Sequence, residues 1–191
     1  MRRLLAIAGL MYALAPGLVM AQQDSSAEFA GYQLNVAIDP ASNLLEVDAT
    51  VQLPPELAGE QVEFLLTNAV EITAAEPAVE PVSAAGAAGF SGINGTSVDL
   101  TERGNVQRYS LRVPDDATLS LSYRGTVNFA LGGQKEQYTR GFQSTAGIIG
   151  DEGIYLAGSS LWYPYFSNDL VTFGLMSNVP EGWHLISQGN G

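Results

Sequence analysis

Few residues of this 191-residue chain could serve as a catalytic base or a zinc ligand. It contains one histidine, His184, and no cysteine. A catalytic zinc site needs about three clustered protein ligands, and a serine hydrolase needs a histidine base beside its serine. His184 lies in the run Trp183-His184-Leu185-Ile186, where it is expected on the polar face of a strand. The chain has neither an HExxH zinc motif nor a Gly-x-Ser-x-Gly turn, so we give His184 a structural role.

Paired carboxylates are the other source of chemistry. The tightest pairs are Asp115-Asp116 and Asp151-Glu152. Such pairs can bind calcium or act as acid and base, but both flank expected turns, where solvated acids are ordinary. We therefore assign this chain no catalytic residue, no metal ligand and no cofactor.

The aromatic run Trp162-Tyr163-Pro164-Tyr165-Phe166 is open to three interpretations. Aromatic side chains dominate burial, so the run could pack in the core at a sheet corner. Trp162, Tyr163 and Tyr165 could instead form a packing surface for a neighbouring domain. A third interpretation is a platform on which sugars stack.

The N-terminal segment has the pattern of a secretory signal. Arg2 and Arg3 precede an apolar run over 4–14, and Val19-Met20-Ala21 supplies small residues for cleavage after Ala21. The run is too short for a spanning helix, which needs about 20 apolar residues. We expect residues 1–21 to be a signal peptide, 22–191 to be one domain, and the protein to be periplasmic or secreted, from a bacterium.

The charge of the chain limits its partners. The full chain carries 8 basic and 20 acidic residues, a net charge of −12. Cleavage after Ala21 would remove two arginines and no acid, giving 6 − 20 = −14. Nucleic acids and anionic membranes need cationic partners, so we expect neither to be bound. Without cysteine, an exported domain depends on its core alone, which fits a bacterial periplasmic protein better than a eukaryotic secreted one.

The hydrophobic period is two almost throughout, and no segment of ten or more residues has a helical period. The turn cluster at 39–43 predicts a hairpin of the strands on either side of it. The stretch 74–95, rich in Ala, Gly and Pro, is expected to be a flexible excursion, and 130–150 a long loop. We predict an all-β antiparallel sandwich with strands at 32–38, 45–53, 62–66, from 70, 109–113, 119–129, 153–157, 171–179 and 183–186.

Three motifs in order carry a resemblance. Tyr-x-Leu-x-Val-x-Ile-Asp-Pro begins at Tyr32, Gly153-Ile154-Tyr155-Leu156 precedes Trp162-Tyr163-Pro164, and the run 178–183 reads Asn-Val-Pro-Glu-Gly-Trp before Ser-Gln-Gly at 187–189. This order resembles the N-terminal domain of aminopeptidase N-like (gluzincin) zinc metallopeptidases. The resemblance implies a β-sandwich that packs against, and caps, a thermolysin-like catalytic domain carrying GxMEN and HExxH.

The resemblance also implies what this chain lacks. Zinc and the catalytic residues are expected in a C-terminal catalytic domain of a longer parent, together with the peptide substrate. The family position near the substrate's amino terminus matches Gly158, which has no side chain, so either this substrate contact is lost or a neighbour, Ser159 or Ser160, substitutes. We further expect the sandwich to be a fragment that is incomplete at its C-terminus, with no catalytic activity of its own.

A second interpretation does not use the resemblance. The chain would be a self-contained periplasmic β-sandwich module that binds carbohydrate or protein. In that case Trp162, Tyr163 and Tyr165 would be the binding residues.

Overall fold

The predicted N-terminal hairpin is confirmed in the computed structural model, which describes residues 30–83, 106–129, 132–133, 143–144, 147–166 and 171–187. Strands β1 (Ala30–Asp39) and β2 (Leu44–Gln52) pair antiparallel. Their side chains alternate between buried and exposed, so one face of the hairpin lies in the core. Asn43, at the turn, has a φ of 58°, a backbone conformation that asparagine tolerates better than most residues.

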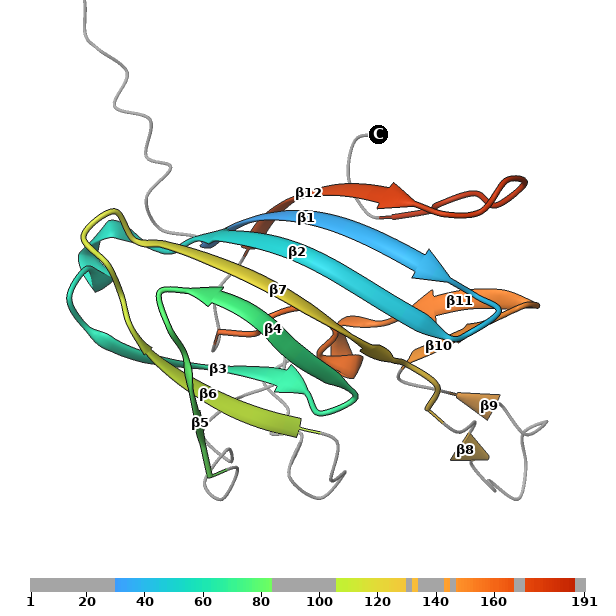
Figure 1. The fold of residues 1–191 in the computed structure, drawn as a ribbon, viewed down its shortest axis with the longest axis horizontal. Coiled ribbons are helices and arrows are strands. Elements are labelled where there is room, and N and C mark those ends of the chain that lie inside the picture. Colours follow the sequence, from blue (N-terminus) through green and yellow to red (C-terminus); the bar gives the residue numbers. More distant parts are fainter. Residues whose placement is uncertain are drawn as a thin grey trace, which may run out of the picture.

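The hairpin belongs to a curved five-stranded sheet (Figure 1). Its order is β12-β1-β2-β7-β4, with β4 (Val70–Glu76), β7 (Thr118–Thr126) and β12 (Val171–Asn178). Strand β7 pairs antiparallel with both β2 and β4, whereas β12 pairs parallel with β1. Strands β12 and β4 therefore form the two edges of this sheet.

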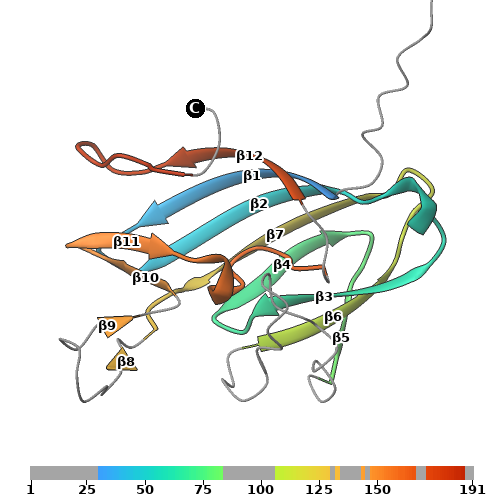
Figure 2. The same cartoon turned by 180° about the vertical axis from the view of Figure 1, so that it is seen from behind.

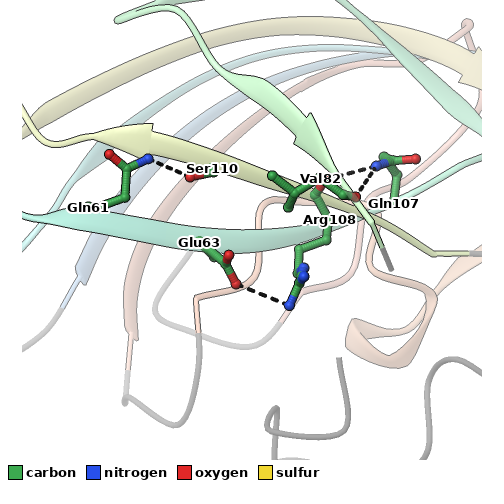
Figure 3. Close-up of polar contacts among 6 residues, drawn as sticks. All are labelled: Gln61, Glu63, Val82, Gln107, Arg108 and Ser110. Atoms are coloured by element: carbon green, nitrogen blue, oxygen red, sulfur yellow. Dashed lines mark hydrogen bonds and ion pairs between the residues drawn. The ribbon is translucent and has the colours of Figure 1, made fainter. Parts of the chain in front are cut away.

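A three-stranded sheet forms the second layer, in the order β3-β6-β5. Its strands are β3 (Gln61–Thr67), β5 (Glu80–Val82) and β6 (Val106–Arg112). Side chains tie the three strands together, as Figure 3 shows: Arg108 on β6 lies 3.3 Å from the Glu63 carboxylate on β3, and the Gln107 amide donates to the Val82 carbonyl of β5 over 3.1 Å.

The core consists of apolar side chains from both sheets in one continuous cluster. Phe64 of β3 and Leu45 of β2 are completely buried. Phe64 stacks on Tyr109 with ring centroids 5.3 Å apart. The burial of large apolar side chains is the main stabilising term of such a sandwich. The most deeply buried large residues of the cluster are Tyr32, Tyr123, Phe64, Leu45, Leu53, Leu66, Leu111, Leu119, Ile149, Val51 and Val113.

The remaining elements are short. Two-stranded pairs are formed by β8 (Gly132–Gly133) with β9 (Gln143–Ser144), and by β10 (Gly147–Gly150) with β11 (Gly153–Leu156). The described residues contain no α-helix, only the 3-10 turns η1 (Pro55–Leu57) and η3 (Gly158–Ser160). The prediction of an all-β fold is therefore confirmed.

Three expectations from the sequence are wrong in detail. The excursion expected at 74–95 does not begin at 74. Strand β4 continues to Glu76 and β5 follows, because Pro81 lies on an edge strand where its missing N–H is tolerated; residues 84–95 lie outside the described part of the chain. In the described parts of 130–150 the chain forms β8, β9 and β10, and the glycines of β8 and β10 hide the alternation. The pairing is also not wholly antiparallel, because alternation shows which face is buried and not the direction of the neighbouring strand.

The strand expected at Trp183–Ile186 is also wrong. A turn at Pro180–Trp183 reverses the chain: the Trp183 N–H donates to the Pro180 carbonyl over 3.1 Å. Gly182 has a φ of 88° and Glu181 is not in the positive-φ region, which makes this a type II turn. Turns of this type splay the two arms of a hairpin. Accordingly, 183–187 has no ladder with β12.

Candidate functional site

The aromatic run lies in a segment that covers the outer edge of the small sheet. The backbones of Leu65 on β3 and Tyr165 exchange two hydrogen bonds of 2.9 Å, and the Thr67 N–H donates to the Leu161 carbonyl over 2.8 Å. Leu161 turns the chain with a φ of 55°. We call Leu161–Phe166 the aromatic strap, because it protects the free edge of β3.

The rings of the strap pack largely against the domain itself. Tyr163 meets Tyr32 edge to face at 5.8 Å, and Trp162 meets Tyr163 at 5.2 Å. The ring centroids of Phe166 and Phe64 lie 5.3 Å apart. Burial, and secondly the nearby Tyr165 hydroxyl, raise the pKa of Tyr163. Trp162, Tyr163 and Tyr165 are half-buried, so each keeps some exposed surface. The assignment of these three residues to domain packing remains a prediction.

Gly158, Ser159 and Ser160 form the single 3-10 turn η3 just before the strap. The Gly158 carbonyl accepts the Leu161 N–H over 3.0 Å. Ser160 is buried, and its hydroxyl donates to the Ala157 carbonyl over 2.7 Å. The turn therefore sets the entry angle of the strap, and its expected role at a substrate's amino terminus remains a prediction.

The residues with acid–base chemistry are dispersed. His184 is exposed, Asp151-Glu152 lies at the β10–β11 turn, and the Asp116 carboxylate accepts the Thr118 N–H at the start of β7. Among the described residues, no three His, Cys, Asp or Glu side chains come together in a way that could hold a metal ion. In the same residues, no helix is long and apolar enough to cross a bilayer.

The exposed apolar side chains are concentrated at β12 and the segment that follows it. Six large apolar residues are exposed in the described chain, and five of them lie between Val171 and Ile186. Ile186 is 93% exposed and Met176 is 69% exposed. The sixth residue, Tyr155, lies on β11. We call the five residues the open apolar surface: Val171, Phe173, Met176, Leu185 and Ile186.

Register explains why two of these residues are exposed. Phe173 lies beside Tyr32 and Val171 beside Ala30, so both share the core-facing side of the large sheet. Tyr32 and Ala30 are buried, but Phe173 is still 45% exposed and Val171 40%. Figure 2 shows why: the small sheet lies beneath the β7–β4 end of the large sheet, far from β12. The core is therefore only partly covered at the β12 edge.

The outer face of the large sheet has a different character. It contains an open hollow of about 760 Å³. Neighbouring strands contribute polar side chains to this hollow, and the Ser122 hydroxyl donates to the Asp48 carboxylate over 2.6 Å. The polar or charged residues that line it are Asn35, Glu46, Asp48, Thr73, Ser122, Arg124, Ser177 and Asn178. Such a face is ordinary for an antiparallel sheet with one side in water.

Comparison with known proteins finds no family model that matches this chain and no similar curated protein. The open apolar surface was not among the residues singled out from the sequence. One signal could have identified it: no charged residue occurs from Leu170 to Pro180, in a chain with 20 acids.

Proposed function

We propose that this chain is a non-catalytic docking domain: the N-terminal β-sandwich of an exported zinc metallopeptidase of the aminopeptidase type. It would pack against the catalytic domain and help to cap its cleft, and that domain would hold the zinc and the peptide substrate. The observation that carries this proposal is the concentration of exposed apolar side chains on β12 and the segment that follows it, because gathered exposed apolar residues mark an interaction site.

The energetics favour burial of this surface. Full burial of a Leu, Ile, Phe or Met side chain contributes about 1.5–3 kcal/mol. Ile186 is 93% exposed and Met176 is 69% exposed, so most of this free energy of burial can still be gained through a contact outside the domain. Phe173 needs a neighbour at the incomplete edge of the core. Phe173 faces the core side of β12 and Met176 the outer side, so a second domain would contact both by covering the edge of this strand.

The family assignment rests on the order of the sequence motifs, and the structure is compatible with it. The motif at 153–164 runs from β11 through η3 into the aromatic strap, and the motif at 178–183 ends β12 and makes the type II turn. The motif at 178–183 therefore leads directly into Leu185 and Ile186. In this proposal Gly158, Ser159 and Ser160 would lie near the substrate's amino terminus, and Trp162, Tyr163 and Tyr165 would add to the packing.

The first test is genetic. The reading frame downstream of this coding sequence should encode GxMEN and then HExxH. An open frame of several hundred codons without either motif would contradict the family assignment.

The second test concerns the surface. The catalytic domain, produced separately, should bind this chain in a calorimeter, and the double variant Leu185→Ser/Ile186→Ser should weaken binding at least about tenfold. Tyr155→Ser is the matched control, since it removes an exposed apolar side chain outside the open apolar surface. Equal weakening by the control, or no weakening by the double variant, would contradict the proposed surface.

The carbohydrate-binding alternative has less support. Trp162, Tyr163 and Phe166 of the strap make ring contacts with one another or with the core, so much of their surface is already used. The hollow on the outer face is lined by polar, charged and aliphatic side chains, and Tyr123, the aromatic residue that borders it, is buried. A sugar platform needs an exposed ring face.

A further inference from the structure

We propose that the free edge of β12 pairs antiparallel with β12 of a second copy of this chain, joining two five-stranded sheets across a two-fold axis. The proposal goes beyond the docking function, because it concerns the backbone edge of the strand, although it shares Phe173 with the open apolar surface. A free strand edge presents unpaired N–H and C=O groups that template pairing with another chain. Two identical partners then close a symmetric dimer.

Among the described residues, the other edges of the five-stranded and three-stranded sheets are protected, and the edge of β12 is not. Edge strand β4 carries Glu71 and Glu76 and a bulge between Ile72 and Ala74. In the small sheet, β5 is three residues long and contains Pro81, and the strap covers β3. Charge, bulges, proline and covering segments are the devices that prevent edge pairing. Strand β12 has eight residues with none of these devices along its length.

Charge explains why a second copy would meet at this edge. Each copy has a net charge of −12, so two copies repel over most of their surface. From Leu170 to Pro180 there is no acid and no base. Antiparallel pairing of β12 with itself therefore places no like charges opposite one another, which is the condition that such a pair must meet.

The pleat of the strand restricts the register. For the core-facing sides of both copies to lie on the same side of the joined sheet, the paired residue numbers must add to an even number. The central register places Gly174 opposite Gly174 of the second copy. Phe173 then lies beside Leu175, and Thr172 beside Met176. Phe173 and Leu175 face the core side, so this register covers the exposed flank of Phe173 with an apolar neighbour.

Sedimentation velocity on the purified chain tests the proposal. We expect a dimer that becomes tighter as salt rises, because salt screens the repulsion between the two acidic copies. Phe173→Lys should raise the dissociation constant at least about tenfold, because a cation would enter the apolar pair. Phe173 is 45% exposed, so the monomer should tolerate the change; its circular dichroism spectrum checks that it folds.

The matched control is Thr73→Lys, which adds the same charge to the exposed face of β4. It should leave the dimer intact. A wild-type chain that stays monomeric at high concentration and high salt would overturn the proposal. Equal dissociation of the dimer by both lysine variants would overturn it too.

A cross-link tests the register without charge changes. Because the chain has no cysteine, Gly174→Cys introduces a single thiol. Its new Cβ would meet only the end of the flexible Gln33 side chain, which can move aside. Oxidation, or a short bifunctional maleimide, should link this variant into covalent dimers. A thiol at Thr73→Cys should link far less. Equal yields from the two positions would contradict pairing at β12.

Discussion

The two edges of the large sheet differ in how completely they are protected. The small sheet lies beneath β4. This strand carries Glu71 and Glu76, and a bulge interrupts its pairing with β7. At β12 the strand is regular and uncharged, and its core-facing side chains remain partly exposed. The difference shows that β4 is a protected edge of the sheet, and it is the reason why we propose further contacts at β12.

Two glycines provide the sharpest contrast between these edges. Gly125 lies on β7 opposite Val70 of β4, and a Cβ there would collide with the backbone of Ala69. We expect Gly125→Ala to lower the free energy of unfolding by about 3 kcal/mol, the upper end of overpacking effects. Gly174→Ala on β12 would displace only the end of the Gln33 side chain, and should cost less than about 1 kcal/mol.

Urea denaturation of the two alanine variants measures this contrast. A loss at Gly174 as large as that at Gly125 would show that β12 is packed as tightly as β4.

Matched valines give a smaller contrast. Val70 begins β4 and is 7% exposed, whereas Val171 begins β12 and is 40% exposed. We expect Val70→Ala to lower the free energy of unfolding by about 2 kcal/mol, through lost burial and a residual cavity. Val171→Ala should cost below about 1 kcal/mol. Urea midpoints of the two variants check the order, and reversal would contradict the difference in coverage.

Buried tyrosines make the stability of the β4 side depend on pH. Tyr123 lies opposite Ile72 of β4; burial, and secondly Tyr32, raise the pKa of its phenol well above the ordinary value. The folded state therefore holds this proton after the unfolded state has lost it. The contribution of the neutral Tyr123 phenol to the free energy of unfolding is fully present below the unfolded-state pKa of about 10. It is lost progressively as the pH rises above that value.

Replacement of that tyrosine gives a small expected effect of the opposite sign. The Tyr123 hydroxyl is buried and finds no hydrogen-bond partner among the described residues. We expect Tyr123→Phe to stabilise the domain by about 1 kcal/mol, because it removes an unsatisfied polar group. It should also flatten the loss of stability above about pH 10. Urea denaturation at neutral and alkaline pH measures both effects; unchanged alkaline sensitivity would contradict the role of Tyr123.

The sequence predicts the fold class well because burial on one face imposes a period of two. The alternation of Leu45, Val47, Ala49 and Val51 therefore locates β2 almost to its ends. It cannot show that β12 runs parallel to β1, because direction depends on how distant segments meet. Nor does it distinguish the exposed Phe173 from the buried Tyr32, since both are apolar residues on the same side of the sheet.

The strap shows the same limit for the candidate site. Its composition predicts aromatic packing, but its role in covering β3 depends on backbone hydrogen bonds between Leu65 and Tyr165, which lie far apart in the sequence. The open apolar surface depends on where the small sheet ends beneath the large one. No local pattern specifies this position.

The contrast between the two edges can be measured directly by amide hydrogen exchange of the purified chain over a range of protein concentrations. Pairing through β12 predicts that the amides of Val171–Asn178 become more protected as the concentration rises, while those of Val70–Glu76 do not change. Protection of β12 that is independent of concentration, or that rises equally in β4, would contradict the assignment of β12 as the associating edge.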